Sequence, residues 1–183
     1  MQEYFRLGEF HIFRAPVFVH WSALVSMGLI LVVYWKDPII AVIALLSFLS
    51  VILIHEIGHA AVANKMGYRV FSIKVSLLHG VCECQDPNYE LDRVKIAWGG
   101  VMAQILVAML VFSLSSLGAI YLAYFGPVLV FLGYYSLLVV PYNLLPVRGL
   151  DGYTAWKIIP IVYQQMKAHS TLKKKLDRDR RGR

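Results

Sequence analysis

Long apolar stretches dominate the chain and are separated by short polar ones. Residues 17–35 carry no charged side chain, residues 38–54 are almost wholly apolar, and no Asp, Glu, Lys or Arg occurs between Lys95 and Arg148. Gly126 and Pro127 divide the last stretch, because this pair interrupts a helix. A helix needs about 20 apolar residues to cross a bilayer. The pattern therefore predicts an all-α multi-pass membrane protein with about four transmembrane helices, near residues 18–35, 39–63, 96–122 and 127–147.

The spacing of polar and apolar residues changes between the second and third predicted spans. Residues 72–77 alternate between polar and apolar side chains, and His79 with Gly80 can turn the chain into residues 81–84. Alternation with a period of two predicts a small β-hairpin, which we expect near the cytoplasmic membrane surface. Two roles are open for it. It is either a purely structural hairpin, or it offers an exposed strand edge that pairs with an extended substrate.

Composition and charge set the class and the orientation of the protein. Hydrophobic residues make up 58% of the chain and charged residues 16%, whereas soluble domains average about 25% charged. This excludes a disordered chain, a disulfide-stapled secreted module and an ordinary water-soluble enzyme. All but Lys36 of the 18 Lys and Arg residues fall on one side if both termini are cytoplasmic, which the positive-inside rule favours. Together with the small size, this predicts a prokaryotic inner-membrane protein with cytoplasmic N- and C-termini.

The remainder of the chain adds little soluble structure. No linker, repeat or soluble accessory domain is evident, so residues 1–183 are predicted to form a single transmembrane domain. The basic tail at residues 164–183 is expected to contact anionic membrane lipids and no nucleic acid, because nothing beside it could read bases. Cys82 and Cys84 lie in the predicted cytoplasmic loop, where we expect reduced thiols rather than a disulfide or a metal site.

The residues most informative about chemistry lie where the second predicted span nears the cytoplasm. The chain reads His55-Glu56-Ile57-Gly58-His59 there. Two histidines four residues apart project from one face of a helix and can bind one ion. Glu56 stands beside the first of them, where its carboxylate can reach a water on the metal. His-Glu-x-x-His is the zinc-peptidase pattern, and ionisable side chains inside an apolar helix require a cavity or a metal.

A catalytic zinc ion normally has three protein ligands, so a third must come from elsewhere in the chain. Asp151 is the first candidate, because Pro141, Pro146 and Gly149 prevent a regular helix before it, and irregular backbone at membrane depth lines cavities or lies buried in protein. The alternative is an ordinary turn aspartate. The other possible ligands in the sequence are His20, His79, Glu83, Asp86, Glu90 and Asp92.

Four segments resemble the site-2 proteases, the intramembrane zinc metalloproteases of peptidase family M50. They are Ala15–Ser22, His55–His59, Trp98–Gly100, and Asn143–Pro146 continued by Asp151-Gly152. The resemblance implies that His55, His59 and Asp151 bind one zinc ion per chain, that Glu56 is the catalytic base, and that Asn143 lines the substrate cleft. The family often has Gly-Pro-x-x-Asn where this chain has Gly99-Gly100-Val101-Met102-Ala103-Gln104, so Gln104 is assigned no role. His20 is expected to be a packed or interfacial histidine.

The predicted function is zinc-dependent hydrolysis of peptide bonds within transmembrane segments, near the cytoplasmic side. The predicted partner is a single-pass transmembrane protein or peptide, whose helix must unwind locally before it is cut. Two other classes remain open, a zinc transporter that uses the same histidines and Asp151, and an inactive membrane scaffold of the same fold. Glu56 beside a paired-histidine site has no evident purpose in a transporter, and the complete set of four residues argues against a scaffold.

Overall fold

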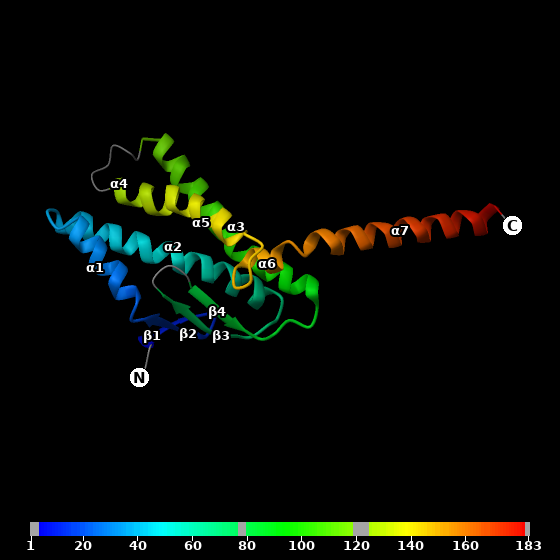
Figure 1. Ribbon diagram of the computed structural model, residues 1–183, viewed down its shortest axis with the longest axis horizontal. Helices are drawn as coiled ribbons and strands as arrows, with labels where there is room; N and C mark the ends of the chain where they lie inside the picture. Colours follow the sequence, from blue (N-terminus) through cyan, green and yellow to red (C-terminus); the bar gives the residue numbers. More distant parts are fainter. Residues whose placement is uncertain (1–3, 77–79, 119–124, 182–183) are drawn as a thin grey trace.

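The computed structural model describes residues 4–76, 80–118 and 125–181, and it is mostly helical with one small sheet (Figure 1). In this part of the chain three helical segments are long and apolar enough to cross a membrane. They are α2 (Pro38–Lys65), α3 (Glu90–Ser116) and the segment Phe125–Asn143, which comprises α4 (Phe125–Val128), the π-helical stretch η2 (Leu129–Tyr135) and α5 (Ser136–Asn143). The protein is therefore an integral membrane protein, as its composition predicts.

Local chemistry explains where the spanning helices begin and end. Asp37 caps α2 by accepting hydrogen bonds from the backbone N–H groups of Ile39 and Ile40, and Pro38 occupies the first turn. The helix α3 begins at Glu90, earlier than the predicted residue 96, because acidic residues in its first turn favour a helix N-terminus. The last span ends at Asn143 instead of residue 147. The end of the third predicted span, residues 119–122, lies outside the described residues.

The first predicted span is not confirmed. Residues 18–20 belong to a strand, β2 (Ala15–His20), and the helix that follows, α1 (Ala23–Val33), has 11 residues. At 1.5 Å per residue α1 is about 16 Å long, which is too short for a bilayer crossing. A short apolar run does not by itself distinguish a buried strand from a helix. Here pairing with a distant strand decides the outcome.

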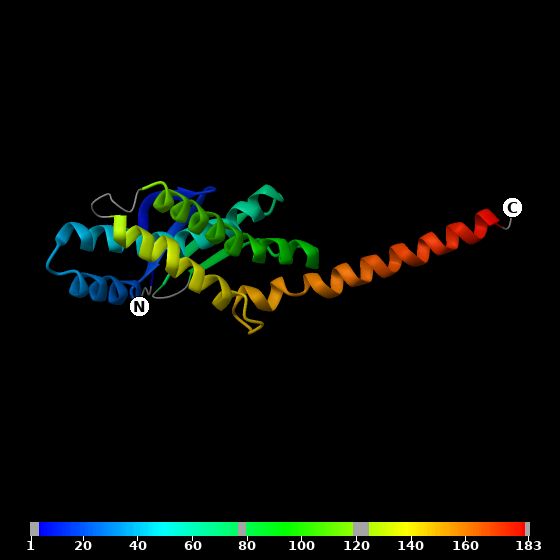
Figure 2. The same cartoon turned by 90° about the horizontal axis from the view of Figure 1, so that it is seen from above.

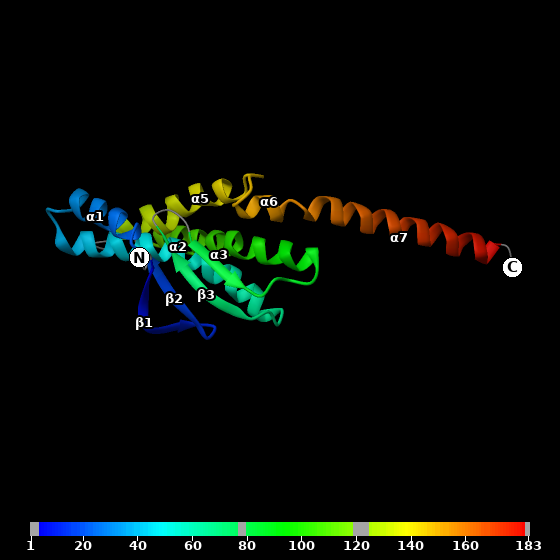
Figure 3. The same ribbon diagram turned by 60° about the horizontal axis from the view of Figure 1, so that its bottom comes forward.

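That pairing belongs to a four-stranded sheet in the order β1-β2-β3-β4. β1 (Tyr4–Ile12) pairs with β2 in antiparallel fashion, β2 pairs in parallel with β3 (Val70–Val75), and β3 pairs in antiparallel fashion with β4 (Gly80–Cys84). The strands β3 and β4 form where the hairpin is predicted, although residues 77–79 of its turn lie outside the described residues. The two N-terminal strands were not predicted. Figure 3 shows the sheet beside α2 and α3.

The sheet packs against the second half of α2. Val17 and Ile73 are fully buried with Ala60 and Ala63 of that helix, in one cluster that also includes Ile96 of α3. The helices α2 and α3 run antiparallel and approach closely, because Gly58 and Gly99 present no side chains to each other. The sheet is thus placed next to the turn of α2 that carries His55 and His59.

The two ends of the bundle differ. The short α1 and the long α2 form a helical hairpin whose turn carries Lys36, the single basic residue at that end (Figure 1). After the last span the chain forms α6 (Asp151–Ala155) and then α7 (Ile158–Arg181), which extends away from the bundle at the opposite end (Figure 2). The sheet and the ends of α2 and α5 lie toward that same end.

Candidate metal centre and active site

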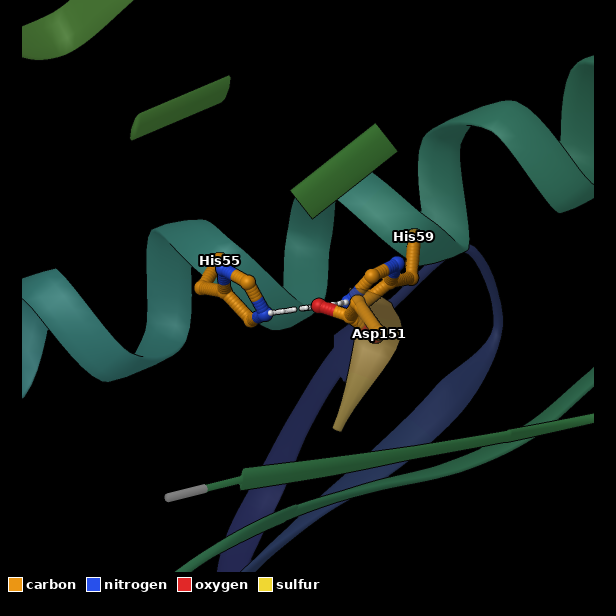
Figure 4. A group of neighbouring side chains, drawn as sticks. All are labelled: His55, His59 and Asp151. Atoms are coloured by element: carbon orange, nitrogen blue, oxygen red, sulfur yellow. Dashed lines mark hydrogen bonds and ion pairs between the residues drawn. The ribbon is translucent and has the colours of Figure 1, made fainter. Parts of the chain in front are cut away.

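Three side chains converge at the centre of the molecule. Asp151 Oδ2 lies 2.9 Å from His55 Nε2 and 3.2 Å from His59 Nε2, and the two Nε2 atoms are 3.1 Å apart. Figure 4 shows the two imidazoles projecting from one side of α2 toward the carboxylate. Both histidines are buried, and Asp151 is partly buried. The spacing of four residues places the histidines together, and the fold brings Asp151 to them.

Contacts with α3 and with the preceding loop hold Asp151 in place. Trp98 of α3 donates its indole N–H to the carbonyl of Ala155 at 3.2 Å, and Trp156 donates to the carbonyl of Leu144 at 2.6 Å. Gly152 packs so tightly on the Leu144 backbone that no side chain fits there. Close packing therefore requires a glycine directly after Asp151. The sequence analysis names Trp98 within a family-like segment without a role and does not single out Trp156, since nothing in the local pattern reveals their long-range partners.

The arrangement fits a tetrahedral metal ion. A zinc ion with ligands at about 2.0–2.1 Å separates those ligand atoms by about 3.3–3.4 Å. The three observed separations, 2.9, 3.1 and 3.2 Å, are close to this value. Imidazole nitrogens with one carboxylate oxygen form a donor set typical of zinc in hydrolases. These residues could therefore hold a metal.

Electrostatics keep the carboxylate ionised. Burial raises the pKa of Asp151, but hydrogen bonds from His55 and His59, together with their electrostatic attraction, outweigh burial and hold the pKa well below its usual range. An ionised Asp151 has its oxygen lone pairs available to a cation at neutral pH. On the other side, His59 Nδ1 lies 2.7 Å from the carbonyl oxygen of Ile96, which orients the ring with Nε2 toward Asp151.

Glu56 lies beside this group and faces the sheet. Its side chain is 3% exposed, and it lines the same cavity as Cys82 of β4. Gly80, the first residue of β4, contacts the Glu56 side chain where any larger residue would collide. The carboxylate is thus held between α2 and an edge strand, next to the histidines but separate from them.

The site opens into a cavity of about 1060 Å³ formed by α2, α3, β4, α5 and α6. Asn143 lines it, with its side-chain nitrogen 3.4 Å from His55 Nε2, and so does Gln104. His20 is not among the described lining residues, and its ring instead lies 2.7 Å from the hydroxyl of Ser22. Cys82 and Cys84 are free cysteines that also line the cavity.

The other carboxylates proposed as possible metal ligands have different partners. Glu83 bonds to Ser72 and Lys74, Asp86 and Glu90 bond to Arg93, and Asp92 accepts a hydrogen bond from Tyr68. His79 lies outside the described residues. Among the residues that the structure describes, the carboxylate that meets the two histidines is therefore that of Asp151.

Comparison with known proteins agrees with this geometry. A family model described as Peptidase M50B-like matches residues 24–172, which include every residue of the site. The chain belongs to this family. The site-2 protease resemblance inferred from the motifs is thereby confirmed. The family assignment covers the spanning helices, the strands β3 and β4 and the segment that carries Asp151.

A solved structure supports the same fold for this M50B-like protein. The chain is similar to the site-2 protease from Methanocaldococcus jannaschii, with a TM-score of 0.68 and 21% sequence identity, over 85% of this chain and 71% of that chain. At this identity the similarity establishes the fold. The comparison with curated proteins found no match.

Proposed function

We propose that this M50B-like protein is a zinc-dependent endopeptidase that cleaves transmembrane segments of membrane-protein substrates near their cytoplasmic end. The observation that carries the proposal is that Asp151 of α6 meets His55 and His59, which lie beside Glu56 on a helix long enough to span a bilayer. His55 lies ten residues before Lys65, the last residue of α2, which is about 15 Å along the helix axis. The site is therefore well inside the membrane-spanning segment.

The residues present would divide the chemistry between them. His55, His59 and Asp151 would hold one zinc ion, which when bound polarises a carbonyl and makes a water acidic near neutral pH. Glu56 is placed to take a proton from the attacking water and deliver it to the departing amine. Asn143, at the cavity wall next to His55, is placed to donate a hydrogen bond from its amide to a substrate backbone carbonyl.

The edge of β4 supplies a means of holding the substrate in an extended form. β4 is the last strand of the sheet, so one of its edges is unpaired. Directly after β4, the backbone N–H of Gln85 donates a hydrogen bond to the carbonyl oxygen of Arg69, which precedes β3. Because backbone N–H groups alternate along a strand, those of Cys84 and Cys82 point the other way. Gly80, at the start of the same strand, contacts the Glu56 side chain. The free edge of β4 therefore faces the catalytic carboxylate. We infer that an unwound substrate pairs with this edge.

We propose the orientation that the charges favour, in which α1, although shorter than a bilayer crossing, brings the chain from the sheet to the turn at Lys36. The turn between α1 and α2 carries Lys36, whereas the sheet and α7 lie toward the opposite end. With that opposite end in the cytoplasm, both termini are cytoplasmic, as expected for a prokaryotic inner-membrane protein. The basic helix α7 then lies where it can meet the anionic headgroups of the cytoplasmic leaflet.

The decisive variant is Glu56→Gln, which keeps the size of the side chain and removes its basicity. We expect the purified variant to retain zinc and to lose cleavage of a transmembrane substrate, by a factor of about 100 to 10,000. Glu90→Gln is the matched control, because Glu90 lies at the start of α3 outside the cavity lining and bonds to Lys157. Cleavage at the wild-type rate by Glu56→Gln would refute the proposed function.

The substrate can be sought by comparing membrane-protein fragments in host cells that carry either the wild type or Glu56→Gln. A membrane protein that accumulates uncut with the variant alone identifies both the reaction and the substrate. The two other classes give different results in reconstituted vesicles. A zinc transporter would carry zinc across the bilayer, and an inactive scaffold would show no change on substitution of Glu56 or His59.

A further inference from the structure

Two buried side chains that line the cavity at the metal centre are incompletely hydrogen-bonded. Among the described residues, the buried side-chain polar atoms without a hydrogen-bond partner are His55 Nδ1 and both amide atoms of Gln104. Gln104 is 1% exposed and His55 is 7% exposed. A buried amide without partners destabilises the folded protein, so such groups normally have a hydrogen-bond partner. Both side chains line the same cavity.

The two histidines differ in the hydrogen bonding of their Nδ1 atoms, the ring nitrogens that face away from Asp151. His59 Nδ1 lies 2.7 Å from the carbonyl oxygen of Ile96, whereas His55 Nδ1 has no partner. His55 Nε2 faces Asp151, so a metal bound there leaves the ring proton on Nδ1. A metal-binding histidine nearly always donates this proton to a carboxylate, carbonyl or water, which fixes the ring and strengthens the ligand. His55 therefore lacks the acceptor that His59 has.

The position of Gln104 on α3 makes it the matching acceptor. Gly100, one helical turn earlier, is so close to the histidines that a Cβ there would lie 2.7 Å from His55 Cε1, the ring atom next to Nδ1. Side chains on a helix lean toward its N-terminus, so Gln104 leans toward the turn that contains Gly100. Gly100 carries no side chain that would block this approach. The amide of Gln104 is thus brought toward the Nδ1 side of the His55 ring.

We propose that Gln104 is a positioning residue for the metal centre: its amide oxygen accepts a hydrogen bond from His55 Nδ1–H, directly or through one water molecule. The helix α3 then orients both histidines, through a backbone carbonyl for His59 and through a side chain for His55. This inference rests on the metal site of the proposed function. It concerns how tightly zinc is held, and it does not require that the protein be a protease.

The test measures zinc affinity of the full-length protein in detergent, by competition with a chromophoric chelator. Gln104→Met removes the acceptor with little change in length, and we expect zinc binding to weaken about 10–100-fold. Gln104→Glu keeps an acceptor, and its affinity should stay within about threefold of wild type or increase. Ser136→Ala is the matched control, because Ser136 is a fully buried polar residue of a spanning segment outside the cavity lining.

A spectroscopic measurement separates positioning from a general loss of structure. The absorption bands of the cobalt-loaded protein report ligand geometry, and we expect them to change in Gln104→Met and to return in Gln104→Glu. Wild-type zinc affinity and an unchanged cobalt spectrum in Gln104→Met would overturn the inference, as would equal weakening in the Met and Glu variants. If Gln104→Met does not fold, Gln104→Leu takes its place. Failure of the wild type to bind zinc would instead refute the proposed function.

Discussion

Gly100 offers the sharpest test of the metal-site geometry, because a single methyl group added at this position would collide with the metal-binding histidines. It lies on α3 directly against the two histidines. A Cβ at this position would come 2.5 Å from His59 Nε2 and 2.7 Å from His55 Cε1. Ordinary contacts between such atoms are about 3.5 Å. The substitution Gly100→Ala therefore requires the rings, or the helix that carries them, to move by about 1 Å.

The expected effect follows from the tolerance of a metal site. Ligand distances must agree with the ideal ones to within about 0.2 Å, so a displacement of about 1 Å breaks the arrangement. Misplacement of this size at a catalytic site can cost about 100-fold in rate. We expect Gly100→Ala to lower the cleavage rate by about that factor and to weaken zinc binding at least about 10-fold. The helix itself does not suffer, since alanine is the better helix former.

The assay compares Gly100→Ala with two other glycine substitutions, measuring zinc competition and substrate cleavage for each. Gly28→Ala in α1 has no atom within 4 Å of its new methyl group, so it should behave as wild type. In Gly99→Ala the new Cβ would lie 2.6 Å from the Gly58 carbonyl oxygen. This methyl group would push α2 and α3 apart, but it would not contact the histidine rings. Zinc affinity of Gly100→Ala within twofold of wild type would refute this reasoning.

Three further predictions concern the sheet. Cys84→Pro removes a backbone N–H from the free edge of β4 and should slow cleavage about fivefold, as loss of about 1 kcal/mol of hydrogen bonding implies, while Cys84→Ala keeps the wild-type rate. Burial raises the pKa of the Cys82 thiol to about 12, so iodoacetamide at pH 8 should alkylate it about a thousandfold more slowly in the folded than in the unfolded protein, as read by mass spectrometry. Hydrogen bonds from Lys74 and Ser72 hold the pKa of Glu83 below its usual value. The stabilisation from Glu83 is therefore present at neutral pH and lost as pH falls below about 4, where the hydrogen-exchange protection factors of β3 and β4, corrected for the intrinsic exchange rate at each pH, should fall in the wild type but not change further in Lys74→Met.

The sequence by itself determined the features that depend on local periodicity. Helix geometry alone brings His55 and His59 to one face with Glu56 beside them, and the length of the uncharged runs alone predicts the helices α2, α3 and Phe125–Asn143. The alternation of residues 72–77 likewise predicted strands where β3 and β4 lie. Each of these inferences needs only the positions of neighbouring residues and the properties of the bilayer.

The tertiary structure decided what depends on contacts between distant residues. Seven side chains could have supplied the third ligand, and packing of Gly152 and Trp98 selects the carboxylate of Asp151. The segment that reads as a first span begins as β2, because Val17 pairs with Ile73 in a parallel register that no local pattern encodes. The burial of Gln104 in the cavity wall and the close approach of Gly100 to the histidines depend on the register between α2 and α3. That register is set by the packing of the two helices as a whole, so only the folded chain reveals it.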